Sequence, residues 1–157
     1  MRIRIQKLID NQTCFTFVVN WLYSEWGNNN YHFWVAWIRS STRPEGIPQT
    51  FVSYVDDVIA GTYILWRCNL QSRQDLFPWF GSLYYDRNFR GKLYVGRKLG
   101  QILLIHSNDQ LKQLGYPQAY LSTDKSIDCC IRDRWKYIGI ASNEKGRPGK
   151  LCVLNIK

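Results

Sequence analysis

The sequence lacks any apolar run long enough to cross a membrane as a helix, which takes about 20 consecutive apolar residues. Its first ten residues, MRIRIQKLID, alternate charged and apolar side chains and contain no continuous hydrophobic core. This alternation predicts a strand and not a signal peptide. We therefore expect no membrane partner.

The C-x-x-C spacing that zinc sites and redox motifs use is also missing. There are five cysteines, an odd number, and two of them, Cys129 and Cys130, are adjacent, which fits neither a simple disulfide nor a zinc site. Cysteines that fit neither a disulfide nor a metal pattern indicate free thiols in a reducing compartment. We expect a cytoplasmic protein without a metal site.

Acidic residues are scarce: 12 Asp and Glu stand against 21 Lys and Arg, which gives a net charge of +9. This balance favours acidic ligands or partners, and nucleic acid is one such class. However, the cations are spread along the chain with one local cluster and no long basic tract. A basic nucleic-acid-binding module is therefore a rival function and not the preferred one.

The length of 157 residues predicts a single domain, residues 1–157, which is large enough to bury roughly two thirds of its unfolded surface in one core. A hydrophobic content of 45% with 15% aromatics is typical of an ordinary folded protein and excludes a disordered one.

The most informative stretch is 79–101, WFGSLYYDRNFRGKLYVGRKLGQ. Bulky residues predict a strand over 79–85, turn residues follow at 86–88, and a basic segment with several glycines leads into a helix. No acidic residue occurs from Arg87 to Asn108. A helix N-terminus beside cations and glycines can bind a pyrophosphate, because its backbone N–H groups are unpaired. The alternative is a structural connection with a solvated charged face.

Four segments resemble the GNAT superfamily of acyl-CoA N-acyltransferases. WFGSLYYDRNFRG resembles the fourth strand and the loop after it, with Asp86, Phe89, Arg90 and Gly91 at the positions of the family's Asp, aromatic residue, Arg and Gly. LGYPQAYLSTD is similar to the turn and fifth strand of the family. WLYSEWG and IPQTFVSYVDDVIAGT are similar to the entry helices and to the second and third strands, so the resemblance covers nearly the whole chain.

The resemblance implies an α/β (α+β) fold: a central, mixed and mainly antiparallel sheet of about six to seven strands, flanked by about four helices. It also implies direct transfer of an acetyl group from acetyl-CoA to a primary amine of a small molecule or a protein. In such a protein the backbone of Leu83, Tyr84 and Tyr85 holds pantetheine and the thioester. The residues that the resemblance assigns to the pyrophosphate loop are Arg90, Gly91, Lys92, Gly96, Arg97, Lys98, Gly100 and Gln101.

The loop departs from the family's R-G-x-G-x-G pattern, because Lys92, Leu93, Tyr94 and Val95 follow Gly91 and the central glycine is missing. Gly96 or Gly100 can match the last loop glycine. We prefer Gly100, since this alignment keeps the usual helix length. A relative that binds CoA without catalysis is therefore the second rival function.

Two residues are candidates for proton transfer. Cys130, in SIDCCIRDRW, stands where the resemblance places a tyrosine that protonates the departing CoA thiolate, although a buried packing role is preferred. Asp75 is the acidic residue nearest the 79–85 strand and is a general-base candidate, although a solvated surface carboxylate is preferred. No Ser-His-Asp or paired-cysteine pattern suggests a covalent acyl-enzyme.

The remaining elements follow from periodicity and turn residues. One helix is expected to follow an N-cap at Asn11 or Thr13, since Phe15, Val18, Val19, Leu22 and Trp26 have helical spacing. Further helices are expected over 31–39, over 101–114 and, after a cap at Ser126, through Arg134. Strands are expected over 51–55 and 58–66, joined by a tight turn at Asp56 and Asp57, and over 119–122, 135–140 and 151–156.

The acceptor is not specified by the sequence, but the charge restricts it. A protein at +9 repels polycations at long range, so aminoglycosides and spermine are poor acceptors unless a local acidic pocket overrides the global field. Small neutral or acidic amines, or a protein N-terminus, fit better. A homodimer is left open.

Overall fold

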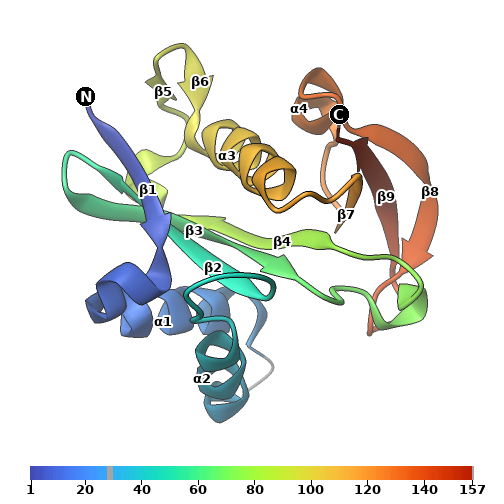
Figure 1. Cartoon of the computed structure of the whole chain (residues 1–157), viewed down its shortest axis with the longest axis horizontal. Helices are drawn as coiled ribbons and strands as arrows, with labels where there is room; N and C mark the ends of the chain where they lie inside the picture. Colours follow the sequence, from blue (N-terminus) through green and yellow to red (C-terminus); the bar gives the residue numbers. More distant parts are fainter. Residues whose placement is uncertain (28–29, 157) are drawn as a thin grey trace. The chain divides into compact units, whose positions relative to one another are not determined.

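The computed structural model describes residues 1–27 and 30–156. Within this part the chain forms a seven-stranded mixed sheet and four α-helices, which confirms the predicted α/β fold (Figure 1). The strand order is β1-β2-β3-β4-β7-β9-β8. Pairing is antiparallel for β1 with β2, for β7 with β9 and for β8 with β9, and parallel for β4 with β7.

The strands of this sheet are β1 (Ile3–Lys7), β2 (Gln49–Val55), β3 (Val58–Trp66), β4 (Trp79–Tyr85), β7 (Gln118–Thr123), β8 (Lys136–Ser142) and β9 (Pro148–Asn155). A separate two-stranded sheet consists of β5 (Leu93–Tyr94) and β6 (Arg97–Lys98). The helices are α1 (Phe15–Trp26), α2 (Tyr31–Ser40), α3 (Leu99–Gln113) and α4 (Asp128–Arg132), with 3-10 turns η1 (Leu8–Cys14), η2 (Gln71–Arg73) and η3 (Arg87–Phe89).

The chain divides into two compact units. The first comprises Met1–Ile64 and Ser82–Leu103, and the second comprises Leu65–Gly81 and Leu104–Lys157. Strand β4 therefore contributes residues 79–81 to the second unit and 82–85 to the first.

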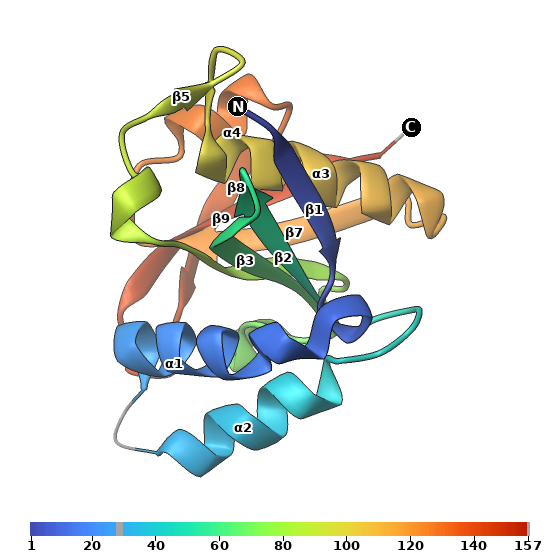
Figure 2. The same ribbon diagram turned by 90° about the vertical axis from the view of Figure 1, so that its left-hand side faces the viewer.

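In the first unit the core forms around β2, in which all seven residues are buried. The Phe51 and Tyr63 rings stack at 4.8 Å between centroids. Helices α1 and α2 lie side by side beside these strands (Figure 2). The two-residue turn between β2 and β3 is confirmed, since Asp56 and Asp57 both have a positive φ, 47° and 66°, as a type I′ hairpin requires.

The second unit is built on β9, which pairs on one side with β7 and on the other with β8. Its largest fully buried side chains are Trp79 and Trp135. From α3 it receives Leu104 and Leu111, both buried, at helical spacing.

Two expectations about element ends were wrong. Neither Asn11 nor Thr13 caps α1: the 3-10 turn η1 precedes the helix, Cys14 is its N-cap residue without a side-chain cap bond, and Asn11 donates through Nδ2 to Tyr54 Oη at 2.7 Å. The last helix covers only Asp128–Arg132, and Arg134 already has a φ of +74°, which ends helical geometry.

Among the described helices the longest is α3, with 15 residues, and none combines the length and apolar character that crossing a bilayer requires.

Candidate active site

The backbone of β4 leaves the extended conformation at Ser82, where φ is +51°. A non-glycine residue adopts this left-handed conformation rarely, at a cost of about 1–3 kcal/mol, and such strain occurs preferentially at functional sites. The recorded pairing of β4 with β7 joins Trp79 to Tyr120, and Tyr120 N also donates to Pro78 O at 2.9 Å. The kink thus follows the paired part of the strand and precedes the residues assigned to pantetheine.

Beyond the kink, Leu83, Tyr84 and Tyr85 are half-buried. The end of β4 is held against β3, because Asp86 N donates to Ala60 O at 2.8 Å. A half-buried strand with a fixed end can present backbone groups to a ligand without rearranging. The assignment of these three residues to pantetheine stays a prediction.

Arg90 lies against the end of the same strand. Its Nε donates to Tyr85 O at 3.2 Å, and its guanidinium carbon lies 5.6 Å from the centroid of the Tyr84 ring and 5.7 Å from that of Tyr85. Arg90 therefore connects the strand to the loop that follows it, in addition to any contact with phosphate.

The residues inserted into the expected pyrophosphate loop form the β5–β6 hairpin. Leu93 pairs with Lys98 and Tyr94 with Arg97, and the turn is made by Val95 and Gly96, with φ of 52° and 78°. Gly96 thus serves a hairpin turn, for which glycine is well suited.

Gly100, in contrast, lies in the first turn of α3, which begins at Leu99. A Cβ at this position would lie 3.0 Å from Cε1 of Tyr85, so the missing side chain lets the helix start approach the end of β4. Gly100, and not Gly96, is therefore the glycine at the helix entrance. Which of them contacts a phosphate remains a prediction.

Exposed cations occur along the segment that leads from β4 to this helix N-terminus. They are Arg87, Arg90, Lys92, Arg97 and Lys98. Gly91 is also exposed, while Gln101 is half-buried in the first turn of α3. Because a helix N-terminus carries about half a positive charge, this end of the first unit suits a polyanion such as a pyrophosphate.

Asp75 lies between η2 and β4 and forms a bidentate pair with Arg73, with Nε to Oδ1 at 3.0 Å and Nη2 to Oδ2 at 2.9 Å. The hydrogen bond from Arg73 lowers the pKa of Asp75 below its ordinary value. A carboxylate with a lowered pKa is a weaker base, so this pairing opposes the general-base role proposed from sequence.

Cys130 lies on α4, and its side chain is buried, with 9% of its surface exposed. Its carbonyl oxygen accepts from Asp133 N and Trp135 N, both at 3.0 Å. The residue thus lies where α4 ends and the buried Trp135 begins, a position suited to packing.

Replacing Cys130 with alanine is expected to reduce the stability by about 1 kcal/mol, as for a small buried side chain, and to leave kcat nearly unchanged. Thermal melting and steady-state kinetics on the same preparation measure the two effects. A thousandfold lower kcat at an unchanged melting temperature would instead assign the proton-donor role to Cys130.

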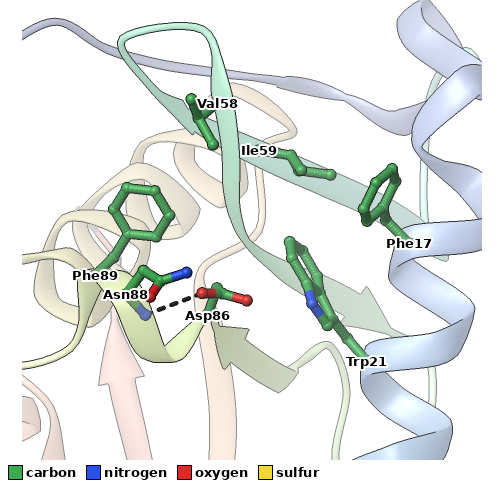
Figure 3. Close-up of a pocket in the computed structure, with 7 residues that line it drawn as sticks. All are labelled: Phe17, Trp21, Val58, Ile59, Asp86, Asn88 and Phe89. Atoms are coloured by element: carbon green, nitrogen blue, oxygen red, sulfur yellow. Dashed lines mark hydrogen bonds between the residues drawn. The ribbon is translucent and has the colours of Figure 1, made fainter.

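The kink at Ser82 could not be predicted from the sequence, since serine has no general preference for positive φ. A pocket in the first unit, lined by residues from α1, β3 and the segment after β4, was not predicted either (Figure 3). Such a pocket depends on the tertiary arrangement of segments that are far apart in the chain.

No protein-family model matches the sequence, and no curated protein matches it. Solved structures match its fold. An N-acetyltransferase from Staphylococcus aureus Mu50 has a TM-score of 0.76 at 16% identity, with 100% of both chains covered. An aminoglycoside 6'-N-acetyltransferase complexed with coenzyme A has a TM-score of 0.70 at 12% identity, with 100% of this chain and 98% of that chain covered.

An acetyltransferase of the GNAT family from Streptococcus pneumoniae has a TM-score of 0.71 at 12% identity, with 99% of this chain and 100% of that chain covered. The chain therefore has the fold of the GNAT N-acetyltransferases, as the sequence resemblance implied.

Proposed function

We propose that the protein is an N-acetyltransferase that transfers an acetyl group directly from acetyl-CoA to a primary amine. The observation that carries this proposal is the kinked β4, which leads through a cationic hairpin into the N-terminus of α3. In support, the fold is shared with N-acetyltransferases, one of which was solved with coenzyme A.

In this proposal the half-buried backbone of Leu83, Tyr84 and Tyr85 holds pantetheine and donates a hydrogen bond to the thioester oxygen. Arg90, Arg97 and Lys98, with the first turn of α3, hold the pyrophosphate, and Gly100 lets that turn approach the Tyr85 ring at the end of β4. The amine nitrogen attacks the thioester carbon, the carbon–sulfur bond breaks and CoA leaves as its thiolate. The proton that the nitrogen loses passes to water, and water protonates the thiolate, so the products are the amide and CoA. The protein accelerates this step mainly by positioning the two reactants and by the backbone donor.

The acceptor in this proposal is an amine of low positive charge. The net charge of +9 opposes polycations such as aminoglycosides, although one of the solved structures with this fold is an aminoglycoside acetyltransferase. We also propose a cytoplasmic location, in keeping with the thiol state of Cys14, Cys68, Cys130 and Cys152.

The test measures binding of acetyl-CoA and its fragments by thermal melting and calorimetry. Acetyl-CoA is expected to raise the melting temperature, because a ligand of the native state stabilises it by mass action. Replacing both Arg90 and Arg97 with alanine is expected to weaken CoA by roughly tenfold or more in calorimetry, and pantetheine much less, because these cations are assigned to phosphate. Lys136→Ala, on exposed β8, is the matched charge control.

Millimolar acetyl-CoA without a melting shift or a heat of binding would contradict the donor assignment. Equal losses of CoA and pantetheine affinity would contradict the assignment of Arg90 and Arg97 to phosphate.

A second candidate function is CoA binding without catalysis. The observation that favours it is the β5–β6 hairpin, which replaces the loop pattern of the family, together with Cys130 at the tyrosine position. Binding of acetyl-CoA without acetylation of any amine in an acceptor screen would identify this function.

A further inference from the structure

The first unit contains a pocket of about 450 Å³, within the range of 300–1,000 Å³ that is usual for small-molecule sites. Helix α1, the start of β3 and the segment after β4 each contribute to its wall (Figure 3). The lining residues are Phe17, Trp21, Val58, Ile59, Asp86, Asn88 and Phe89. We call it the α1 pocket.

Two apolar residues of the α1 pocket are exposed: Phe17 has 54% and Val58 has 57% of its surface exposed. The Trp21 ring is fixed between two others, since its centroid lies 6.2 Å from that of Phe17 and 5.3 Å from that of Tyr84 on β4. Rigid aromatic rings that line a concave, exposed site indicate ligand binding more than core packing.

Among the described residues that line the α1 pocket, only Asp86 is ionisable. Its Oδ1 accepts from Asn88 N at 2.9 Å, which fixes the carboxylate. In the described part of the chain Oδ2 has no hydrogen-bond partner. Figure 3 shows the carboxylate between Trp21 and Asn88, facing the open space.

These observations define the charge of the ligand. A chain with 21 Lys and Arg places none of them in this lining, although Arg87 and Arg90 flank Asp86 and Phe89 in sequence. Arg90 is directed elsewhere, onto the Tyr84 and Tyr85 rings and Tyr85 O. An anion would meet the Asp86 charge, and a neutral apolar ligand would desolvate that charge without pairing it.

We propose that the α1 pocket binds an organic monocation, an ammonium group on an aliphatic or aromatic body. The faces of Phe17 and Trp21 attract the cation through their quadrupoles, Asp86 supplies the opposite charge, and Val58 and Ile59 contact the apolar body. This is the local acidic site that overrides the unfavourable global charge for a ligand with a single positive charge.

The role of this site rests on the proposed function, in which the ligand is the amine acceptor. The acceptor binds as its ammonium form, because an alkylamine with a pKa near 10 is protonated at neutral pH. The contact of Trp21 with Tyr84 connects the α1 pocket to the strand that is assigned to pantetheine. Capture of the ammonium form beside that strand raises the local concentration of acceptor before the amine loses its proton.

Calorimetric titration with benzyltrimethylammonium tests the binding site without acetyl transfer, because a quaternary ammonium cannot be acetylated. Asp86→Asn is expected to weaken this probe roughly fivefold to tenfold, and Phe17→Ser severalfold. Asn at position 86 keeps an oxygen that can accept from Asn88 N, so the start of η3 is preserved. Benzyl alcohol, which has the ring without the charge, is expected to bind more weakly and to be insensitive to Asp86→Asn.

The matched controls are Asp124→Asn, an exposed carboxylate, and Phe33→Ser, an exposed phenyl group on α2 with 47% exposure; neither lines the pocket. Both are expected to bind the probe as the unmodified protein does. No detectable heat with millimolar probe, equal affinity for benzyl alcohol, or unchanged affinity in Asp86→Asn would overturn the proposal.

The acceptor role has its own readout. With 2-phenylethylamine as acceptor, benzyltrimethylammonium is expected to raise the KM for the amine and to leave the affinity for acetyl-CoA unchanged. Turnover without such competition would overturn the acceptor role. Binding of the probe with the predicted variant effects, in a protein that acetylates no amine, would support the cation site and refute the acetyltransferase function.

Discussion

The Ser82→Val substitution is expected to lower kcat/KM for acetyl transfer by roughly two to three orders of magnitude, the loss typical of removing one backbone donor at a developing oxyanion. Ser82 has a φ of +51°, which a β-branched residue tolerates poorly. Valine therefore favours extended backbone at this position. Straightening the strand would turn the backbone groups of Leu83 and Tyr84 away from the thioester, because successive residues of a strand face opposite sides.

Ser82→Gly is the matched control, since glycine adopts a positive φ without strain and also removes the serine side chain. It is expected to retain most of the activity. Both variants are measured by initial rates with saturating acetyl-CoA and by thermal melting, so that a loss of folded protein is separated from a loss of rate. Near-normal kcat/KM in Ser82→Val, with the protein folded, would show that the kink does not align the donor.

The parts of the fold that sequence predicted well are those set by local rules. The β2–β3 turn follows from Asp56 and Asp57 between two apolar runs, because the turn length and its residue types select a type I′ geometry. Helix α2 follows from the helical spacing of Trp34 and Ile38, both of which are buried.

The elements that sequence placed wrongly are those in which a tertiary contact competes with a local one. Asn11 has the right residue type for an N-cap, but its amide is bonded to Tyr54 Oη on β2, and this partner cannot be read from nearby residues. A polar side chain that can cap a helix can equally bond a distant group, and only the folded structure decides between them.

The candidate site was predictable in its strand and helix but not in its loop. The sequence pattern alone does not distinguish Gly96 from Gly100. In the structure Gly96 forms the turn of the β5–β6 hairpin, and Gly100 leaves room for the Tyr85 ring. The α1 pocket was not predictable at all. Phe17 and Trp21 lie outside the apolar stripe of α1 formed by Val18, Val19 and Leu22, so helical spacing assigned them no role.

The Trp79→Ala substitution is expected to have the largest effect on stability, a loss of about 3–5 kcal/mol in the free energy of unfolding. Trp79 has 0% of its surface exposed, and its Nε1 donates to Leu76 O at 2.8 Å. Its ring lies 5.9 Å from that of Tyr120, with which its backbone pairs across β4 and β7. Truncation would remove the ring that fills this part of the second unit and leave Leu76 O without its donor.

Urea unfolding, followed by circular dichroism, measures the loss. Trp79→Phe is expected to cost less than Trp79→Ala, because it keeps a buried aromatic ring. It loses part of the ring volume and the indole N–H bond to Leu76 O, the latter a contribution of about 1–3 kcal/mol. Trp26→Ala is the matched surface control: Trp26 has 43% of its surface exposed and is expected to change stability by no more than about 0.5 kcal/mol. Since a domain of this kind is stable by only about 5–15 kcal/mol in total, Trp79→Ala would remove a large share of that margin. Equal effects of Trp79→Ala and Trp26→Ala would contradict the buried position of Trp79, and with it the parallel pairing of β4 and β7 just before the kink at Ser82.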